Sequence, residues 1–247
     1  MNCIVPDIRQ LKHLIAAMRA IVFPEYYPVT EDAKETLRGI LRCQLSTVVP
    51  DLAEQLTEAF IARLPEISRL LQNDVEAVLH NDPAVTDRGE VILCYPLPNV
   101  MLHYRTAHAL YLLGVPRIPR MLTEMAHSRT GIDIHPAAQI GEFFCIDHGT
   151  GVVIGETTII GSHVVLYQGV TLGAKNFEYD EEGRPIDLPR HPILEDHVTV
   201  YSNTSILGRV RIGHDTTIGG NVWLTQDVPA NSLVLQSTPE IRIKNKN

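Results

Sequence analysis

Aliphatic residues recur at every sixth position through the second half of the chain. The longest unbroken series comprises Leu194, Val200, Ile206, Ile212, Ile218 and Leu224. Two earlier series, offset from one another by two residues, comprise Ile134, Ile140, Ile146 and Val152, then Ile154, Ile160, Leu166 and Leu172. This period fits neither a single strand nor a helix. It is typical of a parallel β-helix, in which each lead side chain points into a coil of stacked short strands.

Glycine follows the lead aliphatic residue in several of these hexads. The glycines are Gly141, Gly155, Gly161, Gly213 and Gly219. At a corner of a coil, glycine permits either a positive φ or the close approach of another segment. The glycines therefore support the coil and mark its corners.

The first half of the chain follows helical spacing instead. Apolar residues recur at intervals of three and four in residues 8–22, 52–64, 70–79 and 100–113, and a further helix is expected at about 120–128. The segment Tyr95-Pro96-Leu97-Pro98 interrupts this pattern and is interpreted as a turn between helices.

Together these patterns predict an α+β fold, with an N-terminal α-helical domain followed by a left-handed parallel β-helix of hexapeptide repeats. We place the helical domain at residues 1–129, with roles in oligomerisation and substrate binding, the β-helix at 130–235 and a C-terminal tail at 236–247. Residues 173–192 are polar and lack the hexad phase, so they predict a long loop inserted in the coil. The flat outer faces of a coil suit packing against identical copies, which predicts a homotrimer with pockets shared by adjacent chains.

Composition excludes several classes of protein. The formal net charge of −8 comes without a basic stripe, so no nucleic-acid partner is expected. No segment has the apolar length of a membrane span, and the N-terminus lacks the pattern of a secretion signal. Cys3, Cys43, Cys94 and Cys145 show no CxxC or zinc-site spacing, which favours free thiols in the cytoplasm.

Histidines next to charged residues are the candidate chemistry. The pairs are Asp133 with His135, Asp147 with His148, and Arg190 with His191 at the end of the long loop. A histidine can accept a hydroxyl proton near neutral pH, and a carboxylate can orient its ring. Any single histidine in such a position is more often a surface residue at a corner of the coil than a catalytic residue. Asp133 and His148 are 15 residues apart, whereas a coil of three hexads has about 18, so ideal stacking leaves them offset.

Several motifs resemble those of the serine O-acetyltransferases of cysteine biosynthesis, a family of hexapeptide acyltransferases. In the coil they are residues 132–138 (IDIHPAA), 146–156 (IDHGTGVVIGE), 168–173 (QGVTLG), 190–192 (RHP) and 206–208 (ILG). In the first half they are residues 81–84 (NDPA) and the helix that carries His108 and Ala109. The resemblance covers nearly the whole chain.

The resemblance implies a role for each matching residue. The implied catalytic residues are His148 as the base, Asp133 as the residue that orients it, and His191. The implied serine-binding residues are Arg190 for the carboxylate, Asp82 and Asp147 for the ammonium group, and Glu156. The implied acetyl-CoA contacts are Gly173, Ala174 and, in the tail, Arg242. These roles suit a zwitterionic acceptor, which needs a fixed cation and a fixed anion.

The resemblance also implies the reaction and the partners. We expect acetyl transfer from acetyl-CoA to the hydroxyl of L-serine, feedback inhibition by L-cysteine, and a homotrimer or a dimer of trimers. No metal is expected, because none of the clusters has ligand spacing. The chain ends in Lys244-Asn245-Lys246-Asn247 rather than in isoleucine, so no complex with the sulfhydrylase of the pathway is expected.

Two alternatives stay open. Another hexapeptide O-acetyltransferase, acting on a sugar or xenobiotic hydroxyl, would share the coil and the histidine but would not need Arg190 with Asp82 and Asp147. A catalytically inert trimeric scaffold would need none of these residues. Asp82, which precedes a proline, also has the pattern of a turn cap.

Overall fold

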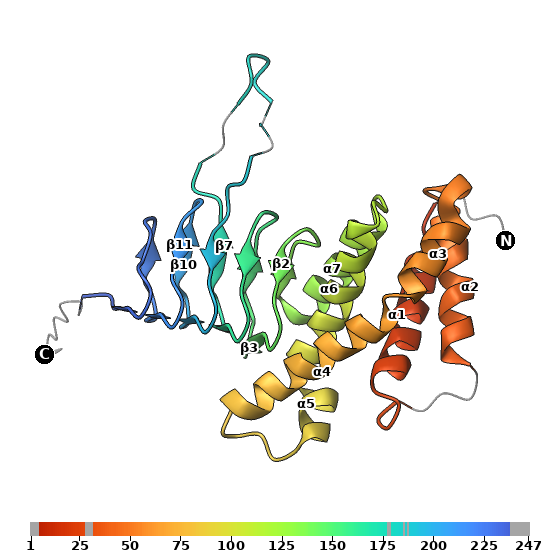
Figure 1. Cartoon of the computed structure of the whole chain (residues 1–247), viewed down its shortest axis with the longest axis horizontal. Helices are drawn as coiled ribbons and strands as arrows, with labels where there is room; N and C mark the ends of the chain where they lie inside the picture. Colours follow the sequence, from red (N-terminus) through yellow and green to blue (C-terminus); the bar gives the residue numbers. More distant parts are fainter. Residues whose placement is uncertain (1–4, 28–31, 177–178, 185, 187, 238–247) are drawn as a thin grey trace, which may run out of the picture.

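Two different halves follow one another along the chain, a group of helices and then a coil of short parallel strands (Figure 1). The computed structural model describes residues 5–27, 32–176, 179–184, 186 and 188–237. Cys3 and Arg242 lie outside the described residues. The molecule is elongated, with the coil towards one end of its long axis and the first helices at the other (Figure 1).

Seven α-helices and one 3₁₀ turn form the first half of the described chain. They are α1 (Ile8–Val22), α2 (Ala33–Leu45), the 3₁₀ turn Pro50–Leu52, α3 (Ala53–Ile61), α4 (Leu64–Asn81), α5 (Arg88–Cys94), α6 (Pro96–Leu112) and α7 (Ile118–Thr130). Asp7, Asp32 and Asp87 accept backbone N–H groups at the starts of α1, α2 and α5. Such caps stabilise a helix by about 1 kcal/mol each.

The helices differ from the sequence prediction at three places. Helices α2 and α5 were not expected from the apolar spacing, and α6 begins at Pro96 rather than near Val100. The break between helices is confined to Tyr95, because Pro96 and Pro98 lie in the first turn of α6. Proline is tolerated there since its missing N–H would have no partner within the first turn.

The second half is the left-handed parallel β-helix that the hexads predict, built from three sheets that form its three faces. Face A contains β1 (Asp133–Ile134), β4 (Val153–Ile154), β7 (Thr171–Gly173), β10 (Ser205–Leu207) and β13 (Trp223–Leu224). Face B contains β2 (Gln139–Ile140), β5 (Ile159–Ile160), β8 (Ile193–Leu194) and β11 (Arg211–Ile212). Face C contains β3 (Cys145–Asp147), β6 (Val165–Tyr167), β9 (Thr199–Val200), β12 (Thr217–Ile218) and β14 (Leu233–Val234).

The lead residues of the hexads stack in register inside the coil. On face A, Ile134 pairs with Ile154, Ile154 with Leu172, and Leu172 with Ile206. Each of these side chains is at most 1% exposed. Burying one such side chain stabilises the fold by roughly 1.5–3 kcal/mol, so the column holds the coil together.

The first coil is longer than three hexads. Asp133 pairs with Val153, two residues beyond the ideal register, and the extra residues lie in the stretch His148–Val152 that joins face C to face A. Val152 is buried, but the strand residue that continues the column is Ile154. The offset between the two hexad series in the sequence is therefore a longer corner.

The corner glycines serve close approach rather than positive φ. Gly141, Gly155, Gly161, Gly213 and Gly219 are absent from the residues with positive φ. An ideal Cβ at Gly161 would lie 2.3 Å from Oδ1 of Asp196, and one at Gly213 would lie 2.3 Å from the backbone N of Ala230. No side chain fits at such distances, because the neighbouring coil already occupies the space.

A buried ion pair joins the helices to the coil. Nε of Arg105 in α6 lies 2.7 Å from Oδ2 of Asp74 in α4, and both side chains are almost fully buried. Arg105 also donates to the carbonyls of Ile140 and Gly141, while Asp74 accepts the backbone N–H of Phe144. Removing one partner would leave a buried charge without compensation.

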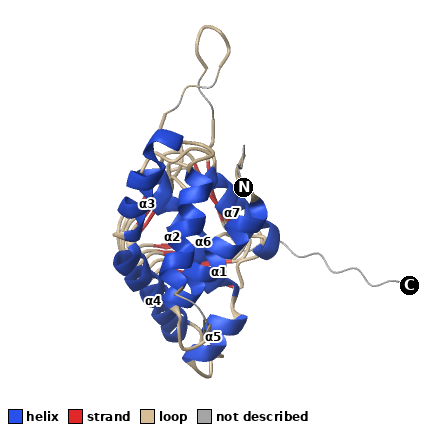
Figure 2. Ribbon diagram, turned by 90° about the vertical axis from the view of Figure 1, so that its right-hand side faces the viewer, coloured by secondary structure: helices blue, strands red, loops and turns tan. Residues whose placement is uncertain are grey.

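The long loop leaves the coil between β7 and β8, at the corner between face A and face B. It projects well beyond the body of the molecule (Figure 2). Within the described part of the chain, no helix combines the length and the apolar character needed to cross a bilayer.

Candidate active site

The candidate residues form two groups on different corners of the coil. Corner C–A, where the chain passes from face C to face A, carries Asp147 and His148 beside Asp82. Corner A–B, where the chain passes from face A to face B, carries Glu156, and the long loop ends there in Arg190 and His191.

Asp82 is held in place at the end of α4. Its Oδ1 accepts the backbone N–H of Ala84 at 2.8 Å, and its Oδ2 accepts the hydroxyl of Tyr95 at 2.7 Å. The Tyr95 hydroxyl and then the Ala84 N–H hold the pKa of Asp82 below its ordinary value. Asp82 therefore makes the local turn and also presents a stable carboxylate, and it lines a small cavity together with Asp147.

His148 occupies a strained corner position. Its φ of 56° lies in the left-handed region, and Gly149 and Gly151 follow with φ of 89° and 81°. Its side chain is 73% exposed, and Nδ1 lies 3.8 Å from Oδ1 of Asp147. The imidazole is thus open to a substrate and lies next to the Asp147 carboxylate.

Thr157 organises the group at corner A–B. Its hydroxyl oxygen accepts the backbone N–H groups of Arg190 and His191, at 2.9 and 3.1 Å. Its own N–H lies 3.1 Å from Nδ1 of His191. The guanidinium of Arg190 contacts the carboxylate of Glu156, and Arg209 donates to the carbonyl of His191 at 3.0 Å.

These contacts assign the protonation of His191. A backbone N–H can only donate, so Nδ1 is the acceptor and the neutral ring carries its proton on Nε2. Burial first, and then the charge of Arg190, lower the pKa of His191 to about 4. His191 is therefore a neutral hydrogen-bond donor at physiological pH rather than a second base.

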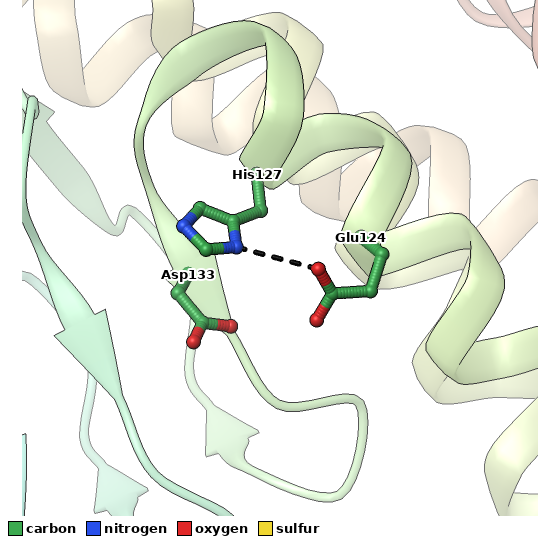
Figure 3. Close-up of side chains that lie close together, drawn as sticks. All are labelled: Glu124, His127 and Asp133. Carbon is green, nitrogen blue, oxygen red and sulfur yellow. Dashed lines mark hydrogen bonds and ion pairs between the residues drawn. The ribbon is translucent and has the colours of Figure 1, made fainter.

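Asp133 lies in a different set of side chains from His148. Glu124 and His127 of α7 point towards Asp133, as Figure 3 shows. Arg120 donates from Nη1 to Oδ1 of Asp133 at 3.4 Å and forms an ion pair with Glu124 at 2.5 Å. Among the described residues, no hydrogen bond or ion pair joins Asp133 to His148. The role of Asp133 as the residue that orients His148 therefore stays a prediction.

Glu124, His127 and Asp133 have ligand atoms within 4.8 Å of one another, the spacing of a metal site (Figure 3). The guanidinium of Arg120 already compensates both carboxylates. A cation would have to displace it, so we assign no metal here. That the reaction needs no metal stays a prediction.

The residues expected to contact acetyl-CoA are only partly described. Gly173 ends β7, and its carbonyl accepts the N–H of Gly208 at 2.9 Å. Ala174 follows at the base of the long loop, whereas Arg242 is outside the described residues.

Two contributors were missed from the sequence. Tyr95 was interpreted only as part of a turn, yet its hydroxyl holds Asp82. Thr157 has no motif of its own, and only the fold reveals that it lies opposite His191. Among the described residues, no hydrogen bond or ion pair links the group at corner C–A to that at corner A–B.

The comparisons with known proteins agree on one family. No family model matches the chain. The plasmid serine acetyltransferase of Synechococcus elongatus is 52% identical over 191 residues, which is 77% of this chain but 60% of that relative. The aligned part thus spans less than two thirds of that relative. A serine acetyltransferase of Helicobacter pylori is 41% identical over 176 residues, 71% of this chain and 98% of the relative.

A solved structure matches nearly the whole chain. Serine acetyltransferase isoform 3 of Entamoeba histolytica, in complex with cysteine, superimposes with a TM-score of 0.84 and 33% identity. The match covers 95% of this chain and 84% of the other. Sequence identity over almost an entire relative and a shared fold lead to the same conclusion: the chain belongs to the serine acetyltransferase family.

Proposed function

We propose that this protein transfers the acetyl group of acetyl-CoA to the hydroxyl of L-serine, giving O-acetyl-L-serine and CoA. The observation that carries the proposal is the grouping of two carboxylates, Asp82 and Asp147, beside the exposed imidazole of His148. This arrangement suits an acceptor with an ammonium group close to a hydroxyl. A sugar has no ammonium group for these carboxylates to bind.

His148 is the proposed base. It accepts the proton of the serine hydroxyl as the oxygen attacks the thioester carbonyl, and returns that proton to the departing CoA sulfur, so the protons balance. Asp82 and Asp147 bind the ammonium group, and Arg190 binds the carboxylate. Neutral His191 offers an Nε2–H donor, and Asp133 stays the proposed orienting residue. Acetyl-CoA supplies only the activated acetyl group.

The site is proposed to lie between two chains. His148 and Arg190 lie on different corners of one coil, so a single chain does not bring them together. A three-fold axis parallel to the coil sets corner C–A of one chain against corner A–B of the next. We therefore propose a homotrimer with three shared sites, and light scattering separates it from a dimer of trimers.

The acetyl-CoA groove is proposed near Gly173 and Ala174. An ideal Cβ at Gly173 would lie 3.0 Å from Cδ2 of Leu207. Any larger residue at this position would crowd Leu207 and raise the surface of the coil, whereas glycine keeps that surface low. A thin thioester arm fits such a surface better than a bulky group.

Cysteine is the proposed feedback inhibitor. Serine acetyltransferases of Entamoeba histolytica form complexes with cysteine, and L-cysteine has the same ammonium and carboxylate groups as L-serine. The proposed compartment is the cytoplasm, because Cys43, Cys94 and Cys145 are free thiols.

The first test is a CoA-release assay with L-serine, galactosides and chloramphenicol as acceptors. Of these three acceptors, we expect only L-serine to be acetylated. Acetylation of a galactoside or chloramphenicol but not of L-serine would reject the proposal. His148→Ala should lower kcat by at least about 100-fold. Arg190→Ala should chiefly raise the KM for serine.

The second test is complementation between inactive chains. His148→Ala and His191→Asn are denatured, mixed in equal amounts and refolded together. A shared site predicts recovery to about a quarter of the wild-type activity, because each seam draws its two chains at random. If the mixture stays as inactive as its components, the site lies within one chain.

A further inference from the structure

A second polar pocket lies beside His148, on the side of the helices. Its volume is about 300 Å³. Arg19 of α1, Asn99 of α6, Arg129 of α7, and His148 and Thr150 of corner C–A line it. Asp82, Asp147, Arg190 and Glu156 do not line it, but Tyr95 lines both this pocket and the small cavity that contains Asp82 and Asp147, so the two adjoin at that side chain.

The two arginines of this pocket lack acidic partners. Arg19 donates to Oδ1 of Asn99 at 2.7 Å, and its guanidinium lies 5.3 Å from the ring centroid of Tyr27. Within the described residues, Arg129 forms no hydrogen bond or ion pair, and no carboxylate pairs with Arg19. Burial, and to a lesser degree the charge of Arg129, lower the pKa of Arg19 below its ordinary value.

The remaining donors of the pocket also favour an anion. Nδ2 of Asn99 is buried and has no hydrogen-bond partner. The first turn of α6 borders the pocket and contains neither an acidic residue nor a side-chain cap. The start of a helix of this length carries a partial positive charge.

A solvated arginine on a surface is common and needs no ligand. Here, however, two cations share one cavity with an amide nitrogen, Nδ2 of Asn99, that has no hydrogen-bond partner, in a chain whose formal net charge is −8. Mutual repulsion of the two guanidinium groups costs free energy unless a negative charge lies between them.

We propose that this pocket binds a compact anion with at least two oxygen atoms, held between Arg19 and Arg129. Guanidinium groups bind such ions through paired N–H donors, and the Asn99 amide would add a further donor. The shared chemistry covers an inorganic oxyanion and the carboxylate of a small organic acid. Because His148 lines the same pocket, the bound anion would lie beside the proposed catalytic base.

The test is calorimetric titration of the full chain without serine or acetyl-CoA, so it does not depend on acetyl transfer. Phosphate and succinate are titrated separately at constant ionic strength set with potassium chloride. We expect saturable binding of one anion per chain with a Kd of about 1 mM or tighter. Tighter binding of phosphate identifies an oxyanion site, and tighter binding of succinate a carboxylate site.

The variants decide whether this pocket is the site. Arg19→Gln and Arg129→Gln should each raise the Kd at least tenfold. Arg9→Gln removes an exposed arginine of the same helix α1 and should leave it unchanged. Arg129 is exposed, so its variant stays folded even if Arg19→Gln does not. Absence of saturable binding to the wild-type chain, or an unchanged Kd in Arg129→Gln, overturns the proposal.

Discussion

Gly155 lies directly against the imidazole of His191. An ideal Cβ at position 155 would be 2.0 Å from Cδ2 and 2.1 Å from Nε2 of that ring. Backbone and ring come from successive coils at corner A–B, so the empty space at one residue is what allows the other to occupy its position.

Replacing Gly155 by alanine should therefore displace His191 rather than simply stiffen the chain. We expect at least a tenfold loss of kcat/KM and a fall of about 1–3 kcal/mol in the free energy of unfolding, the usual cost of overpacking. Steady-state kinetics and urea denaturation measure the two effects. Gly39→Ala is the control, since nothing lies within 4 Å of its added Cβ. It should stabilise α2 by about 0.5–1 kcal/mol and leave activity unchanged. Full activity in Gly155→Ala would contradict the assigned position of His191.

Tyr95→Phe removes the hydroxyl that donates to Asp82 at 2.7 Å. The pKa of Asp82 should rise, because this hydroxyl is the main cause of its lowered value. We expect the KM for serine to rise about three- to tenfold with little change in kcat, since one hydrogen bond to a charged partner is lost. The acid limb of kcat/KM should also move to higher pH.

Tyr201→Phe is the matched control for that variant. Its ring stacks on Tyr167, and its hydroxyl makes no hydrogen bond within the described residues. It should keep the wild-type KM. An unchanged KM and pH profile in Tyr95→Phe would mean that Asp82 does not bind the substrate.

Arg105→Leu breaks the buried pair with Asp74 and leaves an uncompensated carboxylate. The free energy of unfolding should fall by about 3–5 kcal/mol. Arg38→Leu, which breaks surface pairs with Glu35 and Glu58, should cost no more than about 1 kcal/mol. Urea denaturation of both variants checks this. Equal losses in the two variants would show that the buried Arg105–Asp74 pair matters no more to the free energy of unfolding than a surface pair.

Stability should fall as the pH is lowered from 7 to 5, and His103 should account for part of the loss. Burial, with Arg19 and Arg129 nearby, lowers the pKa of His103 to about 4. The unfolded chain takes up this proton below about pH 6.5 and the folded chain does not, so protonation favours unfolding. The contribution is about 2 kcal/mol between pH 7 and pH 5. His103→Gln should lose that much less stability over the same range, and an identical pH dependence in both proteins would refute the assignment.

The hexads predicted the interior of the coil well, because phase alone decides which residues enter the column. Ile206 and Leu224 are buried lead residues at the positions where the period of six places them. Helix α2 was missed although its signal is present: Asp32 caps it, and Leu37, Leu41 and Leu45 recur at intervals of four. Polar residues between them hide this narrow stripe.

The candidate site was harder to predict than the fold. Asp147 and His148 are neighbours in the chain, so their proximity follows from sequence. Asp82 reaches them only because α4 ends beside β3, which no local pattern reveals. Asp133 could not be placed from spacing, since the longer corner changes the register and side chains of α7 meet its carboxylate.

Arg105 donates hydrogen bonds to the carbonyls of Ile140 and Gly141, so the two ends of the β-helix differ in how firmly they are held. These hydrogen bonds attach the first turn of the coil to the helices. Local unfolding of the coil should therefore begin at its last turn, near Leu233. Local opening of the far turn should therefore leave the corner that carries His148 undisturbed.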